Sequence, residues 1–260
     1  MAVRIGIIGC GQVAHLHLQG LQATDAEIVA LSDVSSENAQ ALVAKIGEIP
    51  VFTSYKKMLS TVDLDAVIIG VRNNLHFEIA SACIEHGAAI FCEKPLTADA
   101  QESKELVEKV QESKIIFMMG FMKRHHTAYK KMKELVNESG PVLHANIHQC
   151  IHVPVEQMQA KQLRQQWWGW DKEASRGGSL VHSGSHELDI IRFLIGEPAS
   201  ITAHFKFVPG LDGMDHYCAA MLEMQQGFST LIDFTAMPYS KYGKVHGGWI
   251  EQIEIYCEKG

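Results

Sequence analysis

The sequence lacks several features, and each absence excludes a class of protein. No apolar run approaches the roughly 20 residues that a membrane-spanning helix needs, and the apolar run at the N-terminus is broken by glycines. That run is therefore expected to be a first strand and turn rather than a secretory signal. Basic residues are also few, since 23 Lys and Arg against 30 Asp and Glu leave a formal net charge of −7. We expect neither a nucleic-acid partner nor a membrane partner.

Paired cysteines are missing as well. The six cysteines lie at positions 10, 83, 92, 150, 218 and 257, and no two of them form a CxxC motif. This scatter favours reduced thiols inside a protein core over a disulfide framework, and therefore a cytoplasmic protein. Hydrophobic residues at 47% and charged residues at 20% are the values of an ordinary folded globular chain.

The first 120 residues alternate short apolar runs with longer amphipathic segments. The apolar runs are too short for helices and almost uniformly apolar, as parallel strands covered on both faces are. They are Val3–Ile8, Ile28–Ser32, Ala66–Ile69, Ala89–Cys92 and Ile115–Gly120. Helical patterns lie between them, at Ser36–Ile46, Phe77–Glu85 and Ala98–Glu112. This alternation predicts an α/β domain with a doubly wound parallel sheet over residues 1–121.

The pattern changes after Phe121. A charged amphipathic helix is expected at Ala128–Glu138. Apolar and polar residues then alternate by twos at Ile201–Phe207 and Ile250–Cys257, as in an antiparallel sheet with one covered face. We therefore expect a second domain over residues 122–260. The sequence ends three residues after the last expected strand, which suggests a chain that is truncated at its C-terminus or unusually short.

The first expected strand leads into a glycine-rich segment of the form GxGxxA, at residues 9–14. Gly9 permits a tight turn, Gly11 lets the backbone approach a pyrophosphate, and Ala14 lets the next helix pack closely on the strand. The first N–H groups of that helix, which begins near Gln12 and Val13, would then face the phosphates. The segment predicts a dinucleotide-binding turn.

Asp33 follows the second expected strand and comes nineteen residues after Ala14. This is close to the spacing of about 20 expected for the acidic residue that binds the adenosine ribose. A carboxylate there would accept hydrogen bonds from the ribose hydroxyls and repel a 2′-phosphate. No basic residue follows before Lys45. The sequence therefore predicts NAD rather than NADP as the cofactor, with a turn or helix-capping role for Asp33 as the alternative.

A third motif, Glu93-Lys94-Pro95, follows the strand expected at Ala89–Cys92. Together with the glycine-rich segment and Asn73-Asn74-Leu75-His76, it resembles the Gfo/Idh/MocA family of dehydrogenases, which includes glucose–fructose oxidoreductase and inositol dehydrogenase. The resemblance extends over all 260 residues. It implies an N-terminal Rossmann domain followed by an α+β domain with a large, mostly antiparallel open sheet. It also implies a homodimer or homotetramer formed through that sheet.

The resemblance assigns roles to residues at the ends of the parallel strands. Lys94 would polarise a substrate hydroxyl and stabilise the developing alkoxide, unless it is an ordinary solvated lysine. Glu93 is implied near the nicotinamide ribose, while Asn73 and His76 are implied to line the cofactor cleft. Arg72 replaces a proline that is usual in relatives. It would bind an acidic group of the substrate or a cofactor phosphate, or lie on the surface.

A second constellation, Gly177–Asp189, resembles the family pattern GG…D-x-x-x-H-x-x-D. His186 and Asp189 match the pattern, but His182 replaces the usual aspartate. A neutral imidazole cannot supply the permanent negative charge that raises the pKa of a partner histidine. We expect His186 to be the general base, His182 to modulate or relay, and Asp189 to contact substrate. A metal held by the two histidines with Asp189 or Glu187 is the alternative, although HExxH is absent and the family chemistry needs no metal.

Two further positions are expected near the substrate. Arg124 matches a position that is often basic in the family and would help to fix the domain junction. Trp170, with Trp167 and Trp168, precedes the glycine pair. These tryptophans would form the wall of a sugar-sized pocket or pack in the core.

These residues predict reversible oxidation of a secondary alcohol to a ketone on a sugar, cyclitol or related polyol. His186 would remove the hydroxyl proton, Lys94 would stabilise the oxygen, and the hydride would pass to NAD. Two alternatives belong to other classes. One is a regulatory protein that senses dinucleotide without turnover, and the other is a lyase or epimerase that uses NAD transiently.

Overall fold

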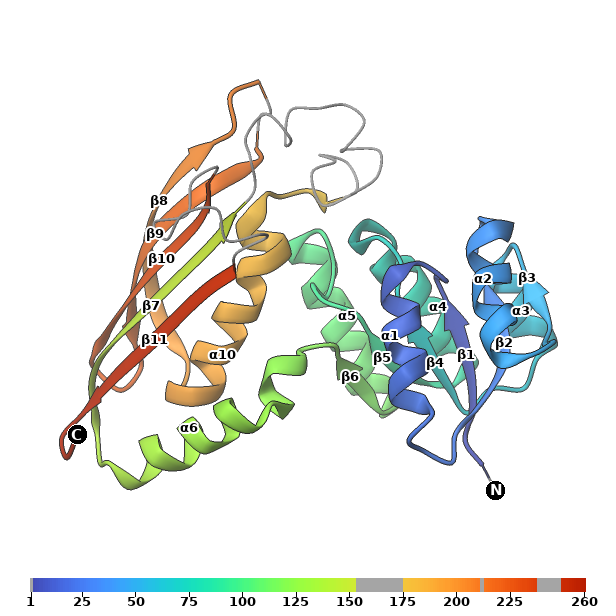
Figure 1. Cartoon of the computed structure of the whole chain (residues 1–260), viewed down its shortest axis with the longest axis horizontal. Helices are drawn as coiled ribbons and strands as arrows, with labels where there is room; N and C mark the ends of the chain where they lie inside the picture. The colour runs from blue at the N-terminus through green and yellow to red at the C-terminus, as the bar shows by residue number, and fades with distance from the viewer. Residues whose placement is uncertain (1, 153–174, 211–212, 238–248) are drawn as a thin grey trace. The chain divides into compact units, whose positions relative to one another are not determined.

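The computed structural model describes residues 2–152, 175–210, 213–237 and 249–260. The chain divides into two compact units, Met1–Gly120 and Phe121–Gly260 (Figure 1). The sequence-based boundary, between residues 121 and 122, differs from this division by one residue.

The first unit contains a six-stranded sheet in the order β3-β2-β1-β4-β5-β6. Its strands are β1 (Arg4–Ile8), β2 (Glu27–Ser32), β3 (Val51–Phe52), β4 (Ala66–Ile69), β5 (Ala89–Cys92) and β6 (Phe117–Met119). Every pairing in it is parallel. The strand order reverses between β1 and β4, which creates the switch point where open α/β sheets bind ligands. The predicted Rossmann fold is confirmed.

Helices cover both faces of this sheet. They are α1 (Gln12–Leu21), α2 (Ser36–Ile46), α3 (Tyr55–Thr61), α4 (His76–His86) and α5 (Ala100–Ser113), with a 3₁₀ turn, η1 (Asn73–Leu75). Neighbouring residues of β4 show why the strands are apolar throughout. Ile69 packs in one buried cluster while Ile68 packs in another. Because successive side chains of a strand point to opposite faces, both faces of the sheet are dry.

The second unit contains a five-stranded sheet in the order β11-β7-β10-β9-β8. Its strands are β7 (Val142–His152), β8 (Pro198–Phe207), β9 (Asp215–Met224), β10 (Ser229–Met237) and β11 (Trp249–Cys257). Among the described strands of this sheet, β7 and β10 pair in parallel, and the other pairings are antiparallel. The predicted mostly antiparallel sheet is confirmed.

Helical segments cover one face of this second sheet. They are η2 (Met122–His125), α6 (Thr127–Glu138), the π-helical turn η4 (Leu180–Gly184) and α10 (Ser185–Ile195). Figure 1 shows α6 and α10 on the same side of the sheet. Ile190 and Leu194 of α10 are buried in one cluster with Ile147 and Phe234 of the sheet. None of the described helices is both long and apolar enough to cross a membrane.

The opposite face of the second sheet is more open. Met221, Leu231 and Tyr256, on three different strands, are 41%, 52% and 44% exposed. The edge strand β8 is exposed along almost its whole length. The sheet therefore has one covered and one open face, as its alternating sequence predicts.

Candidate active site

The glycine-rich turn between β1 and α1 is shaped by one tight contact and one open space. Gly9 has a φ of +91°, and a Cβ there would lie 2.5 Å from the backbone oxygen of Gly70. Conformation and space therefore both require glycine. A Cβ on Gly11 would instead meet no protein atom within 4 Å. Because Gly11 precedes the N-terminus of α1, this space suits a pyrophosphate bound by backbone N–H groups.

Asp33 is held against this turn by two backbone hydrogen bonds. Its Oδ2 accepts from the N–H of Cys10 and its Oδ1 accepts from the N–H of Ser35, both at 2.7 Å. Ser35, rather than Asp33, caps α2 by accepting a hydrogen bond from Asn38. The carboxylate therefore lies beside the glycine turn, in the position where the ribose-binding acid of an NAD site is expected. These residues fit NAD.

Glu93 and Lys94 follow β5 at the carboxyl edge of the sheet. Oε1 of Glu93 lies 2.9 Å from Nε2 of His17 on α1, and both side chains are 17% exposed. A Cβ on Gly120 would lie 2.9 Å from Oε2 of Glu93, so the glycine after β6 leaves space for the carboxylate. Lys94 is partly buried, and its peptide bond to Pro95 is cis. His17 was not among the site residues predicted from the sequence.

Asn73 and His76 are both buried after β4, each 1% exposed. Nδ1 of His76 lies 2.8 Å from the backbone oxygen of Pro95, and Nε2 lies 3.2 Å from that of Val71. Burial lowers the pKa of His76, and a neutral ring donates to only one of the two oxygens. His76 therefore braces the segment after β4 against the Glu93-Lys94-Pro95 turn. Arg72 is exposed.

In the second unit, His182 and His186 lie on one continuous helical segment. It begins with the π-helical turn η4 and continues as α10, and π-helical turns are frequent at functional sites. His186 is 5% exposed, and its ring meets the ring of Phe121 edge-on, with centroids 6.2 Å apart. His182 is less buried, and its Nδ1 lies 3.3 Å from Oγ of Ser183.

Asp215, at the start of β9, anchors the turn that precedes this helix. Its Oδ1 accepts from the N–H of Gly178 at 3.1 Å, and its Oδ2 accepts from the N–H of Leu180 at 2.9 Å. Asp215 is 5% exposed, and burial raises its pKa. A Cβ on Gly178 would lie 2.2 Å from the backbone nitrogen of Asp215. This close approach explains the second glycine of the pair. Asp215 was not among the site residues predicted from the sequence.

Arg124 and Asp189, both predicted to lie near the substrate, contact each other. The guanidinium donates from Nε to Oδ2 at 2.8 Å and from an Nη to Oδ1 at 2.6 Å. Asp189 has a 3% exposed side chain, whereas that of Arg124 is 40% exposed. This two-point ion pair joins η2 to α10. A substrate contact for either residue stays a prediction.

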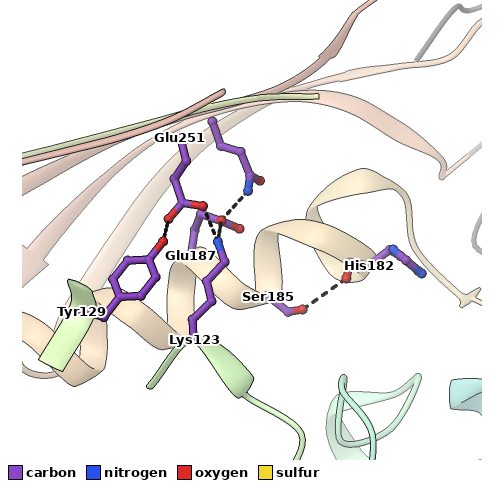
Figure 2. Close-up of polar contacts among 7 residues, drawn as sticks. Lys123, Tyr129, His182, Ser185, Glu187 and Glu251 are labelled. Atoms are coloured by element: carbon purple, nitrogen blue, oxygen red, sulfur yellow. Dashed lines mark hydrogen bonds and ion pairs between the residues drawn. The ribbon is translucent and has the colours of Figure 1, made fainter. Parts of the chain in front are cut away.

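A buried polar cluster lies beside this pair (Figure 2). Lys123 of η2 donates to Glu187 of α10 and to Glu251 of β11. Gln149 donates to Glu187, and Tyr129 donates to Glu251. From the sequence, Glu187 was predicted only as an alternative metal ligand. Within the described parts of the chain, no group of three or more His, Cys, Asp or Glu side chains could hold a metal ion.

The tryptophans before the glycine pair were predicted to form the wall of a pocket or to pack in the core. Trp167, Trp168 and Trp170 lie outside the described residues. Lys94 belongs to the first unit, and the two histidines belong to the second.

Comparisons with known proteins agree with both units. Residues 3–121 match the model of the oxidoreductase family with an NAD-binding Rossmann fold, and residues 129–260 match the GFO/IDH/MocA C-terminal domain. Inositol 2-dehydrogenase 3 of Saccharopolyspora erythraea is 34% identical over 155 residues, which are 58% of this chain and 45% of that protein. The chain spans about half the length of several curated relatives that it matches.

Solved structures share the fold over nearly the whole chain. The WlbA dehydrogenase of Bordetella pertussis, in complex with NADH and UDP-GlcNAcA, gives a TM-score of 0.85 at 22% identity, covering 99% of this chain and 74% of that one. The scyllo-inositol dehydrogenase of Lactobacillus casei, with bound NAD(H) and scyllo-inositol, gives a TM-score of 0.82 at 22% identity. The match covers 100% of this chain and 75% of that one. Since the family models match both units, the chain belongs to the Gfo/Idh/MocA family of oxidoreductases and carries its NAD-binding Rossmann domain followed by its C-terminal domain.

Proposed function

We propose that the chain is an NAD-dependent dehydrogenase that interconverts a secondary alcohol and a ketone on a sugar, cyclitol or related polyol. One observation carries the proposal: Asp33 is fixed against a glycine turn that leaves open space at Gly11. Relatives named as inositol dehydrogenases support the choice of substrate class.

The first unit would hold the cofactor, which supplies a hydride acceptor when bound. Backbone groups of Gly9, Gly11, Gln12 and Val13 would face the pyrophosphate, and Asp33 would accept hydrogen bonds from the adenosine ribose. Residues proposed for the nicotinamide end follow β4 and β5. They are Asn73, His76, Glu93 and Lys94.

Two residues would act on the reacting hydroxyl. His186 would remove its proton, and Lys94 would donate a hydrogen bond to the oxygen and stabilise its developing negative charge. His182 would modulate the base or relay its proton. Substrate contacts are proposed for Arg72, Arg124, Trp170 and Asp189.

The proposal is tested with purified protein from which bound nucleotide has been removed. Calorimetry should detect binding of NAD⁺ and NADH, and a polyol panel with NAD⁺ should give an increase in NADH absorbance. If neither nucleotide binds, the proposal is overturned. Binding without turnover would identify a dinucleotide sensor. Product formation without net NADH would identify a lyase or epimerase.

Replacement of Lys94 tests its place in the reaction. Lys94→Ala should lower kcat by about 10²- to 10³-fold, the usual loss when one donor to a developing oxyanion is removed. NADH binding should change little, because the rest of the cofactor site is intact. Unchanged turnover would remove Lys94 from the mechanism.

We also propose a cytoplasmic homodimer or homotetramer, assembled through the open face of the second sheet. Exposed apolar side chains on that face, such as Leu231 and Met221, support an interface there. All six cysteines are free and buried, which supports a reducing compartment. Light scattering after size exclusion should give a dimer or tetramer, and Leu231→Lys should dissociate it.

A further inference from the structure

We propose that Lys123, Glu187 and Glu251 are positioning residues for His186, because the buried cluster that they form fixes the rotation of α10. The inference rests on the proposed function, in which His186 is the base. It concerns residues that act through the histidine and do not themselves touch substrate.

The cluster is buried and joins many elements. The side chains of Lys123, Glu187 and Glu251 are 9%, 2% and 17% exposed. With Gln149 and Tyr129, they come from η2, α10, β11, β7 and α6. Figure 2 shows the labelled side chains of this cluster converging from the helix, the sheet and the segments beside them. A buried ion pair resists displacement, since separating the partners leaves an uncompensated charge.

Glu187 follows His186 directly in α10, and this adjacency links the cluster to the base. Successive side chains of a helix leave its axis in fixed directions, so a helix cannot rotate without moving all of them. Glu187 points into the cluster, where it is bound by Lys123 and Gln149. The direction in which the His186 side chain leaves the helix is therefore fixed by the anchorage of its neighbour.

A second contact anchors the same helix at a neighbouring position. Arg124 follows Lys123 in η2 and holds Asp189 by the two-point ion pair. Asp189 lies three residues after His186, on the same side of the helix. The ring of Phe121, from the same short segment, meets the His186 ring. Lys123 and Arg124, which are consecutive in η2, thus hold α10 at Glu187 and at Asp189, two positions close to His186.

The charges and hydrogen bonds of Glu187 suggest two variants, of which one keeps the anchoring hydrogen bonds and the other loses them. Two carboxyl groups face one ammonium, and burial raises the pKa of Glu187 to about 7, with Glu251 adding to the rise and Lys123 opposing it. Oε1 of Glu187 accepts from both Lys123 and Gln149. Glu187→Gln retains an oxygen for these donors, whereas Glu187→Leu retains similar bulk and loses the acceptor.

The first test needs neither substrate nor turnover. Protein labelled with ¹⁵N-histidine is studied by NMR, and the ring signals of His186 are assigned by their loss in His186→Gln. Those signals should move in Glu187→Leu and stay nearly in place in Glu187→Gln. Arg192→Gln is the matched control, because Arg192 lies on the same helix and its exposed ion pair with Glu197, 2.6 Å long, is made with a residue just beyond the end of that helix. Unmoved His186 signals in folded Glu187→Leu would overturn the inference.

The second test separates kcat from the KM for NAD⁺, with myo-inositol and scyllo-inositol as probes. Small displacements of a reacting group cost on the order of 10²-fold in rate, so Glu187→Leu should lower kcat by about 10- to 100-fold. The KM for NAD⁺ should stay within about twofold, and Glu187→Gln should recover most of the kcat, because only the position of the base is altered. Equal kcat in wild type and Glu187→Leu would overturn the inference.

The two tests fail in distinguishable ways. If wild type turns over no polyol, the proposed function fails, and the NMR comparison still decides whether Glu187 positions His186. If circular dichroism shows that Glu187→Leu does not fold, Lys123→Met is used in its place. The same NMR and kinetic measurements are made, and the same results support or overturn the inference. Methionine keeps the apolar stem of Lys123 and removes only the ammonium.

Discussion

Nε2 of His17 lies 2.9 Å from Oε1 of Glu93, so the helix that begins at the glycine turn is joined directly to the Glu93-Lys94-Pro95 segment. Both side chains are 17% exposed. Hydrogen bonds to charged groups contribute about 1.5–3 kcal/mol. The contact therefore links the two ends of the proposed NAD site within the first unit.

His17→Ala should weaken NAD⁺ binding by about tenfold, which corresponds to roughly 1.4 kcal/mol. The reason is that Glu93 loses its partner and is no longer held at the end of β5. Calorimetric titration measures the change. His17→Gln keeps an N–H that can reach the carboxylate, and should restore most of the affinity. Equal dissociation constants for wild type and His17→Ala would show that the contact has no part in cofactor binding.

Asp33 should determine the preference for NAD over NADP. Its carboxylate is oriented by the N–H groups of Cys10 and Ser35, so its free lone pairs are available to a ribose. Asp33→Ser should lower kcat/KM for NAD⁺ by about 10- to 100-fold, the equivalent of one hydrogen bond to a charged group. The loss for NADP⁺ should be smaller, since a repulsive charge is also removed. Wild-type protein that prefers NADP⁺ would contradict the assignment.

The first unit was predictable where its signals are local. The helix expected at Ser36–Ile46 has those bounds in the structure, because Ser35 caps its start and Gly47 ends it with a positive φ. The strand Val51–Phe52 was missed, since two residues are too few to show a period. The other strands of this unit were predicted because they are almost uniformly apolar, whereas the short helix Tyr55–Thr61 was also missed.

The polar contacts of the second unit could not be predicted, because their partners are far apart in the chain. Lys123 and Glu251 are separated by 128 residues, and Gly178 and Asp215 by 37. The sheet register pairs Glu251 with Gln149 and so places two members of the cluster side by side, but Lys123 comes from η2, outside the sheet. The alternation puts Glu251 on the same face as Ile253 and Ile255, but the sequence does not show which partners a carboxylate there would have.

Replacement of Asp215 should loosen the turn before the helix of the two histidines. Asp215→Ala leaves the N–H groups of Gly178 and Leu180 without their acceptor, which costs about 1–3 kcal/mol for each buried group. For a chain of this size we expect Tm to fall by about 5–10 °C, and kcat to fall with little change in the KM for NAD⁺. Calorimetry and steady-state kinetics measure both effects.

The Tm and kcat of Asp215→Asn should lie between those of wild type and Asp215→Ala. Its amide oxygen can accept from one N–H, but its NH₂ group is a donor and cannot accept from the other. Asp233→Asn is the matched control: its side chain is 50% exposed, and its partner His148 lies 3.3 Å away on the open face of the sheet. A Tm for Asp215→Ala as close to wild type as that of Asp233→Asn would show that the turn does not need the carboxylate.

Glu187 should make the protein less stable as the pH rises through neutrality. Burial raises its pKa from 4.5 to about 7, with Glu251 adding to the rise and Lys123 opposing it. The folded state therefore keeps a proton that the unfolded chain loses. The resulting stabilisation is complete below about pH 4.5 and is lost as the pH rises through about 7; its full size is about 3 kcal/mol.

The measurement is the free energy of unfolding in urea at about pH 5 and about pH 8, for wild type and Glu187→Gln. Wild type should lose about 2–3 kcal/mol more than the variant over this interval, because glutamine has no proton to release. Tyr129, Lys123 and Glu251, the other titratable groups of the cluster, are present in both proteins. Identical pH dependence in the two would show that Glu187 is ionised in the folded state throughout, held in that form by Lys123 despite its burial.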